Sequence, residues 1–271
     1  MDYQHFIIQK DGGVSHVMIN RPNKANSLDT TSWHELKAIF ESLKADPETR
    51  AIVLSGEGKH FCAGIDVSLL VGMNMEGAQH SCDGRRGEWV RETVAHLQVC
   101  VNTIEECKKP VMAAIHGGCI GAGLDIAAAC DMRYCTESTA FSIKEIDMGL
   151  VADLGSIQRL PHILPDGIIR ELAYTGRKFL AGEALTHGLV NAVYKDKEEM
   201  MDAVMSVAGQ IAEKSPLCIR GIKDNILYAR DHTVADGLNY IQVWNAAMLL
   251  SDDLKKAGEA YMMKQKPEFA N

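Results

Sequence analysis

Short apolar runs alternate with amphipathic helical patterns through the first two-thirds of the chain, and no other feature limits the possible folds as much. Most of these runs are apolar enough to be buried on both faces, as the strands of a parallel sheet are. They span residues 16–20, 50–56, 110–117, 132–136 and 189–194. Between the first two runs, Asp29 can cap a helix that has apolar residues at helical spacing. The alternation predicts an α/β fold with a parallel core.

After about residue 197 the sequence is helical throughout, apart from a few turn residues. This change predicts two parts, a core of residues 1–197 and a C-terminal helical region of residues 198–271. The helical region is rich in methionine, which in helices is more typical of packing in a core or between subunits than of a cofactor site.

Charge and cysteine content argue against several classes of protein. The formal net charge of −8 argues against a nucleic acid or an anionic membrane as a general partner, although a local basic patch can still hold the phosphates of a small ligand. None of the eight cysteines forms a Cys-x-x-Cys pair, and most have apolar neighbours. We therefore expect reduced, buried thiols and no metal site. No apolar run reaches the ~20 residues that cross a bilayer.

The two ends of the chain show no targeting signal that we recognise. The stretch MDYQHFIIQKDGG lacks the basic and apolar segments of a signal peptide and the Arg-rich composition of a transit peptide. The final Phe-Ala-Asn differs from the peroxisomal Ser-Lys-Leu. These observations lead us to expect a cytoplasmic protein.

Two glycine-rich turns follow predicted strands. GCIGAG (118–123) has its glycines in the wrong order for a dinucleotide-binding turn, and GEGKH (56–60) lacks the spacing of a phosphate-binding loop. In HFCAGIDV (60–67) and HGGCIGAGLD (116–125), glycines let the backbone turn sharply and leave amide groups free near a helix start. Two such turns at one cleft could direct two N–H groups at one oxygen, which is an oxyanion hole, although a simple tight turn is the commoner outcome for either.

Four motifs occur in order along the chain: RPNKANSLD, HFCAGIDV, HGGCIGAGLDIAAACDMRYC and FSIKEIDMGLVADLGSIQRLP. Together they resemble the crotonase, or enoyl-CoA hydratase/isomerase, superfamily over roughly residues 5–265. The resemblance implies a crotonase-like spiral of ββα units with an acyl-CoA site in residues 1–197. It implies that residues 198–271 build a homotrimer or a homohexamer and complete part of the CoA and acyl pocket. Coenzyme A would be part of the substrate, so no separate cofactor is expected.

The same resemblance assigns the oxyanion hole to the backbone N–H groups of Ile65 and Ala122. Many relatives have glycine at the second position, and alanine keeps the N–H group while adding a methyl group. The residues expected to bind the substrate are Ala63, Gly64, Ile65, Asp66, Val67 and Ala122. The residues expected to hold the CoA phosphates are basic ones that the sequence does not rank, such as Lys24 or lysines near the C-terminus.

Three acidic residues match the catalytic positions of the family. In hydratases, two glutamates at the positions of Asp125 and Glu145 hold the attacking water, and the position of Asp153 is usually glycine. The trio Asp125, Glu145 and Asp153 instead resembles members that isomerise 3,5-dienoyl-CoA to 2,4-dienoyl-CoA in fatty-acid β-oxidation. That resemblance implies Asp153 as the base at C2, Glu145 as the acid at C6, and Asp125 in an assisting role.

Other interpretations of these residues and of the whole chain remain open at this stage. Taken alone, Glu145 or Asp153 would more often be a helix cap or a surface charge. His116 is more typical of a packed histidine than of a catalytic one, and Asp66 could cap the next helix. The nearest alternative function is an enoyl-CoA hydratase that adds water to 2-enoyl-CoA. RNA binding, known for some members of the superfamily, is disfavoured by the net charge of −8.

Overall fold

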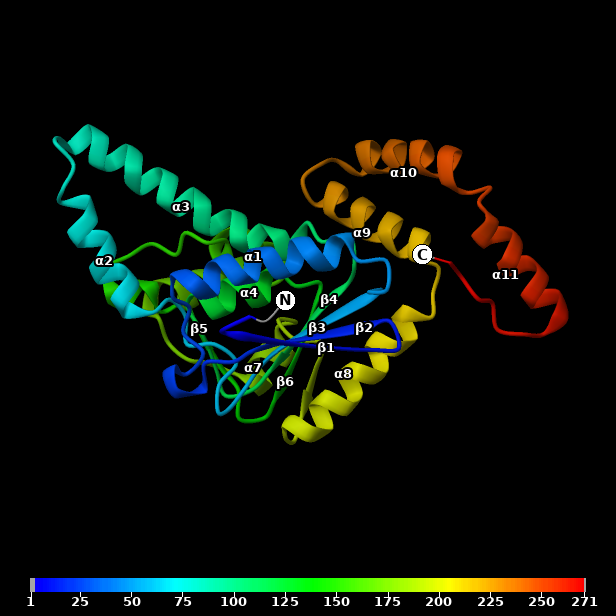
Figure 1. Ribbon diagram of the computed structural model, residues 1–271, viewed down its shortest axis with the longest axis horizontal. Helices are drawn as coiled ribbons and strands as arrows, with labels where there is room; N and C mark the ends of the chain where they lie inside the picture. Colours follow the sequence, from blue (N-terminus) through cyan, green and yellow to red (C-terminus); the bar gives the residue numbers. More distant parts are fainter. Residues whose placement is uncertain (1–2, 271) are drawn as a thin grey trace.

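The computed structural model describes residues 3–270 and has a six-stranded sheet at its centre, in the order β1-β2-β3-β4-β6-β9 (Figure 1). These strands are β1 (Phe6–Asp11), β2 (Val14–Ile19), β3 (Ala51–Gly56), β4 (Val111–Ile115), β6 (Met132–Thr136) and β9 (Ala192–Tyr194). β1 pairs with β2 in an antiparallel hairpin, and every later pair in this sheet is parallel. The predicted parallel core is confirmed, and each of the five predicted runs overlaps one strand.

A second, smaller sheet pairs β5 (Gly118–Ile120) with β7 (Ala140–Ser142) and β7 with β8 (Phe179–Leu180). The sequence analysis did not predict these strands, because two or three residues are too few to show an apolar period. β1 was also missed, since only its first residue, Phe6, is buried.

Helices cover both faces of the main sheet. They are α1 (Thr30–Ala45), α2 (Val67–Gly77), α3 (Asp83–Glu105), α4 (Ala122–Ala129), α5 (Ser156–Arg159), α6 (Asp166–Thr175), α7 (Ala181–Thr186), α8 (Lys197–Ala212), α9 (Pro216–Arg230), α10 (Val234–Met248) and α11 (Asp252–Met263). Short 3-10 turns occur at Pro22–Lys24, Lys144–Met148 and Leu160–His162. Asp29 caps α1 as predicted, because its carboxylate accepts a hydrogen bond from the Ser32 N–H at 2.9 Å.

Alternate residues of each central strand enter two separate cores. In β3, Ile52 and Leu54 pack in the core that includes α1, α3 and α4, whereas Ala51 and Val53 pack in the core that includes α8. Figure 1 shows α8 on the side of the sheet opposite α1 and α3. α8 therefore covers the main sheet, and the division of the chain at residue 197 stays a prediction.

The last two helices, α10 and α11, extend away from the sheet, while α9 lies against the core (Figure 1). The predicted helical run after residue 231 is interrupted at residues 249–251, where the chain turns between α10 and α11. The described residues of α10 and α11 include no buried side chain. The segment 67–87 forms α2 and the first turn of α3, with Asp66 as the cap of α2.

All eight cysteines are free; six are buried, while Cys82 and Cys218 are exposed. Within residues 3–270, no helix has the length and apolar character needed to span a membrane.

Candidate active site

The two glycine-rich turns predicted from the sequence lie directly beside each other. Cys62 and Cys119 form a parallel β-bridge, with hydrogen bonds from the Cys62 N–H to the Gly118 carbonyl at 3.1 Å and from the Ile120 N–H to the Cys62 carbonyl at 3.0 Å. A Cβ atom on Gly64 would lie 2.9 Å from the Ile120 carbonyl oxygen. The close approach of the two backbones therefore depends on glycine at this position, where φ is +94°.

The two expected oxyanion donors are both available. Within residues 3–270, neither the Ile65 N–H nor the Ala122 N–H donates a hydrogen bond to another protein group. Ala122 is the first residue of α4, so its N–H belongs to the positive end of that helix. The left-handed φ of +52° falls on Gly121, and Ala122 is not among the described residues with positive φ. The alanine therefore fits without backbone strain.

The first acidic residue, Asp125, is fully buried on α4. Its Oδ1 accepts a hydrogen bond from the Ser156 N–H at 2.6 Å, while its Oδ2 has no partner among the described residues. Burial, with the nearby carboxylates of Glu145 and Asp153, raises the pKa of Asp125 to about 7. Asp125 can thus hold or release a proton near neutral pH.

Glu145 and Asp153 lie close enough to Asp125 to raise its pKa. The Glu145 carboxylate lies against the turn before α4, since a Cβ on Gly121 would be 3.1 Å from Oε1. Glu145 Oε2 is buried without a partner among the described residues. Burial raises the pKa of Glu145, and the neighbouring Asp153 charge adds to the effect. Asp153 is exposed as a residue, but partial desolvation of its carboxyl group also raises its pKa.

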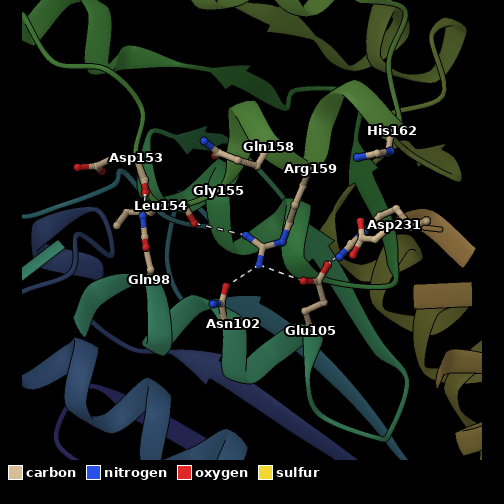
Figure 2. A pocket seen from close by; sticks show the side chains of 11 residues that line it. Gln98, Asn102, Glu105, Asp153, Leu154, Gly155, Gln158, Arg159, His162 and Asp231 are labelled. Carbon is tan, nitrogen blue, oxygen red and sulfur yellow. Dashed lines mark hydrogen bonds and ion pairs between the residues drawn. The ribbon is translucent and has the colours of Figure 1, made fainter. Parts of the chain in front are cut away.

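Two cavities adjoin this carboxylate cluster. One, of about 310 Å³, lies between α3, the turn at Asp153 and the end of α9 (Figure 2). The other, of about 380 Å³, is lined mainly by apolar residues that include Ile146, Leu150 and Val151. The apolar run between Glu145 and Asp153 thus borders the second cavity.

The other predicted residues fall around the two turns. Ala63 and Val67 are exposed, and Val67 begins α2. Hydrogen bonds from Ser68 and from Arg21 lower the pKa of Asp66 to about 2. Both oxygens of its carboxylate therefore already accept hydrogen bonds from protein groups. His116 is buried, with Nε2 3.0 Å from the Gly58 carbonyl oxygen, which agrees with a packing role.

Sequence reasoning missed the groups that hold the carboxylates in place. Besides the Ser156 N–H, these are Gln98 and Arg159, which contact the turn at residues 153–155. Gln98 is on α3, 55 residues from Asp153 in the chain, and it directly follows the buried Leu97. No pattern in the local sequence could have linked Gln98 with a residue so far away in the chain.

This arrangement has the elements of a site for proton transfer beside a carbonyl group. Two free N–H groups can stabilise a carbonyl oxygen that gains negative charge, and carboxylates with raised pKa values can take and return protons. The fold and the site therefore fit an enzyme that stabilises an enolate. The individual roles of the residues stay predictions.

Comparisons with known proteins agree with this class. A family model described as enoyl-CoA hydratase/isomerase matches residues 9–271. The peroxisomal Δ3,5-Δ2,4-dienoyl-CoA isomerase of Arabidopsis thaliana is 45% identical over 97% of this chain and 96% of its own length. The mitochondrial Δ3,5-Δ2,4-dienoyl-CoA isomerase of Homo sapiens is 45% identical over 91% of this chain and 75% of its own. The crystal structure of enoyl-CoA hydratase from Bacillus anthracis has a TM-score of 0.89 at 28% identity, covering 98% of this chain and 99% of its own.

The chain belongs to the enoyl-CoA hydratase/isomerase family. The predicted family, the crotonase fold class and the assignment to isomerases are confirmed. The expected cytoplasmic location is wrong, because relatives at 45% identity are named as peroxisomal or mitochondrial. The error arose because targeting depends on short segments read by receptors, so the failure to recognise one says little about location.

Proposed function

We propose that this chain converts 3,5-dienoyl-CoA to 2,4-dienoyl-CoA in fatty-acid β-oxidation. The observation that carries the proposal is the cluster of Asp125, Glu145 and Asp153 beside two unpaired backbone N–H groups. The proposal is further supported by the two isomerases of that name at 45% identity.

The reaction requires two separate proton-transfer groups. It removes a proton from C2 and adds one at C6, and these carbons are roughly 5 to 6 Å apart in an extended chain, beyond the ~3 Å reach of one fixed carboxylate. Asp153 takes the C2 proton, and the electrons of that bond move into a dienolate. The Ile65 and Ala122 N–H groups hold its oxygen. Glu145 gives a proton to C6, which leaves double bonds at C2 and C4.

Asp125 assists through its charge and position. Each turnover leaves Asp153 protonated and Glu145 ionised, so a proton must return to Glu145 before the next one. Because the pKa of Asp125 is about 7, this buried carboxyl can exist in either form at neutral pH and can share in that return. The steps move only protons and electron pairs within the substrate, so we propose that no cofactor or metal takes part beyond the CoA of the substrate.

The chain is further proposed to bind the CoA thioester along the turn of residues 63–67 and to assemble as a homotrimer or homohexamer. Lys24 is exposed beside this turn, since the Ala63 N–H donates to the Ala25 carbonyl at 3.0 Å, and is a candidate for a CoA phosphate. The assembly proposal is supported by the exposed apolar side chains of α10 and α11, such as Leu238 and Met262.

One assay separates the isomerase from the hydratase. Purified protein is given 3,5-dienoyl-CoA and 2-enoyl-CoA separately, and absorbance is followed for growth of the conjugated 2,4-diene or for loss of the enoyl group. We expect fast diene formation and slow or no hydration. Fast hydration without diene formation would contradict the proposal and favour the hydratase.

A further inference from the structure

The backbone at Asp153 is held by a side chain from a distant helix. Nε2 of Gln98 on α3 donates a hydrogen bond to the Asp153 carbonyl oxygen at 2.7 Å. Among the described residues, no other residue hydrogen-bonds to Asp153. Figure 2 shows the Asp153 carboxylate directed away from Gln98 and from Arg159, while the carbonyl faces Gln98. Within residues 3–270 the carboxylate therefore has no hydrogen-bond partner, which leaves its oxygens open to a substrate proton.

The residues after Asp153 have firmer anchors. Leu154, Gly155 and Ser156 are buried, and the Ser156 N–H is bound to Asp125. The Arg159 guanidinium lies against Gly155 so closely that a Cβ there would be 1.9 Å from Nη1.

Arg159 in turn is fixed to α3. Its Nη2 donates to Asn102 Oδ1 at 2.7 Å and pairs with Glu105 Oε2 at 3.1 Å (Figure 2). Asp153 itself is exposed and precedes the buried residues of this turn. The hydrogen bond from Gln98 is what holds its backbone in place.

We propose that Gln98 is a positioning residue for Asp153, acting through the Asp153 carbonyl group to aim the carboxylate at C2 of the substrate. This inference rests on the proposed function, which makes Asp153 the base. An aspartate carboxylate is separated from its backbone by only two rotatable bonds, so its direction follows the backbone closely. Proton transfer depends steeply on such alignment, and a misplacement of about 1 Å can cost about a hundredfold in rate.

The first test replaces the donor. Gln98→Ala is expected to lower kcat about tenfold, to change KM by less than about twofold and to leave Tm nearly unchanged, because the lost hydrogen bond is on the surface. Gln98→Glu keeps the shape but cannot donate once ionised, so it is expected to show a similar fall at neutral pH. With substrate deuterated at C2, the kinetic isotope effect is expected to rise in both variants, since C2 proton removal limits the rate more strongly.

Gln210→Ala is the matched control. Gln210 is also an exposed glutamine on a helix, but it lies on α8, which covers the other face of the main sheet from α3. It is expected to keep the kcat and the isotope effect of the unmodified protein. If Gln98→Ala behaves like Gln210→Ala, the inference is overturned.

A double-mutant comparison tests whether Gln98 acts through Asp153. In an Asp153→Asn background, Gln98→Ala is expected to cause no further loss of rate, because the group it positions is gone. A full additional tenfold loss would show that Gln98 acts elsewhere and would overturn the inference.

Failure of the proposed function can be recognised separately. If the unmodified protein forms no 2,4-diene, that function fails, and Gln98 is then judged by exchange of the C2 hydrogen of the same CoA thioester with D₂O, followed by NMR. This exchange needs the base at C2 but no proton delivery at C6. Slower exchange in Gln98→Ala than in Gln210→Ala upholds the positioning role, and equal rates overturn it.

Discussion

Asp125 is a buried carboxyl whose protonation differs strongly between the folded and unfolded chain. Its pKa rises from 3.8 to about 7 on folding, mainly through burial. Between these values the folded state binds the proton more tightly, so the free energy of unfolding falls as pH rises from about 4 to about 7. Asp125→Asn removes this dependence while keeping an acceptor for the Ser156 N–H.

From pH 5 to pH 8 the unmodified protein should lose about 3 kcal/mol of unfolding free energy through Asp125, and Asp125→Asn should not show this loss. Urea unfolding at the two pH values measures this difference. Asp202→Asn, at an exposed position on α8, is the control and should show the same loss as the unmodified protein. Equal pH dependence in the Asp125→Asn and unmodified proteins would mean that Asp125 stays ionised when buried.

Asp153 distinguishes the proposed isomerase from the hydratases of its family. Asp153→Asn removes the proposed base but keeps the size of the side chain, so kcat for diene formation should fall about 10²–10⁴-fold, with KM nearly unchanged. Asp147→Asn is the control in the same run of sequence, because Asp147 is an exposed carboxylate paired with Lys144. Full activity in Asp153→Asn would show that this carboxylate has only a structural part.

At the scale of elements, the glycine turn before α2 sets the geometry of the oxyanion donors. Gly64→Ala places a methyl group 2.9 Å from the Ile120 carbonyl oxygen and forces a side chain into φ of +94°. The two turns must move apart, and with them the N–H groups of Ile65 and Ala122. We expect kcat to fall about 10²-fold, comparable to loss of one oxyanion donor.

Gly72→Ala provides the matched control for this effect. Gly72 is on α2, a Cβ atom there would have no heavy atom of another element within 4 Å among the described residues, and alanine favours helix over glycine. The activity of this variant should match that of the unmodified protein. If both alanine variants kept full activity, the close approach at Gly64 would not matter for catalysis.

The elements differ in how far the sequence could predict them. β3 and β4 were predictable because they contain four and five consecutive apolar residues, and every residue of both strands is buried. β5 and β7 are recognisable only from the pairing of β7 with β5 and with β8, because three residues show no period of their own. In the same way, the three carboxylates stand in motifs that can be recognised, whereas Gln98 reaches Asp153 only because α3 folds back across the turn.

At the scale of the whole molecule, the C-terminal region exposes several large apolar side chains, a feature that often marks an interface between proteins. The exposed fractions of Leu250, Tyr261 and Met262 are 92%, 83% and 82%. The proposed homotrimer or homohexamer would bury side chains of this kind between subunits, and their removal from water would stabilise the assembly.

Light scattering coupled to size-exclusion chromatography tests this assembly directly. We expect the unmodified protein to have three or six times the chain mass of 29.7 kDa, and Leu250→Glu combined with Met262→Glu to shift it toward one chain, because charged side chains cannot be buried there without a large cost. Ser206→Glu combined with Gln210→Glu adds the same charges at exposed polar positions of α8 and should leave the mass unchanged. An unmodified protein with the mass of one chain would contradict the proposed assembly. It would then leave α10 and α11 in need of some other partner for their apolar side chains.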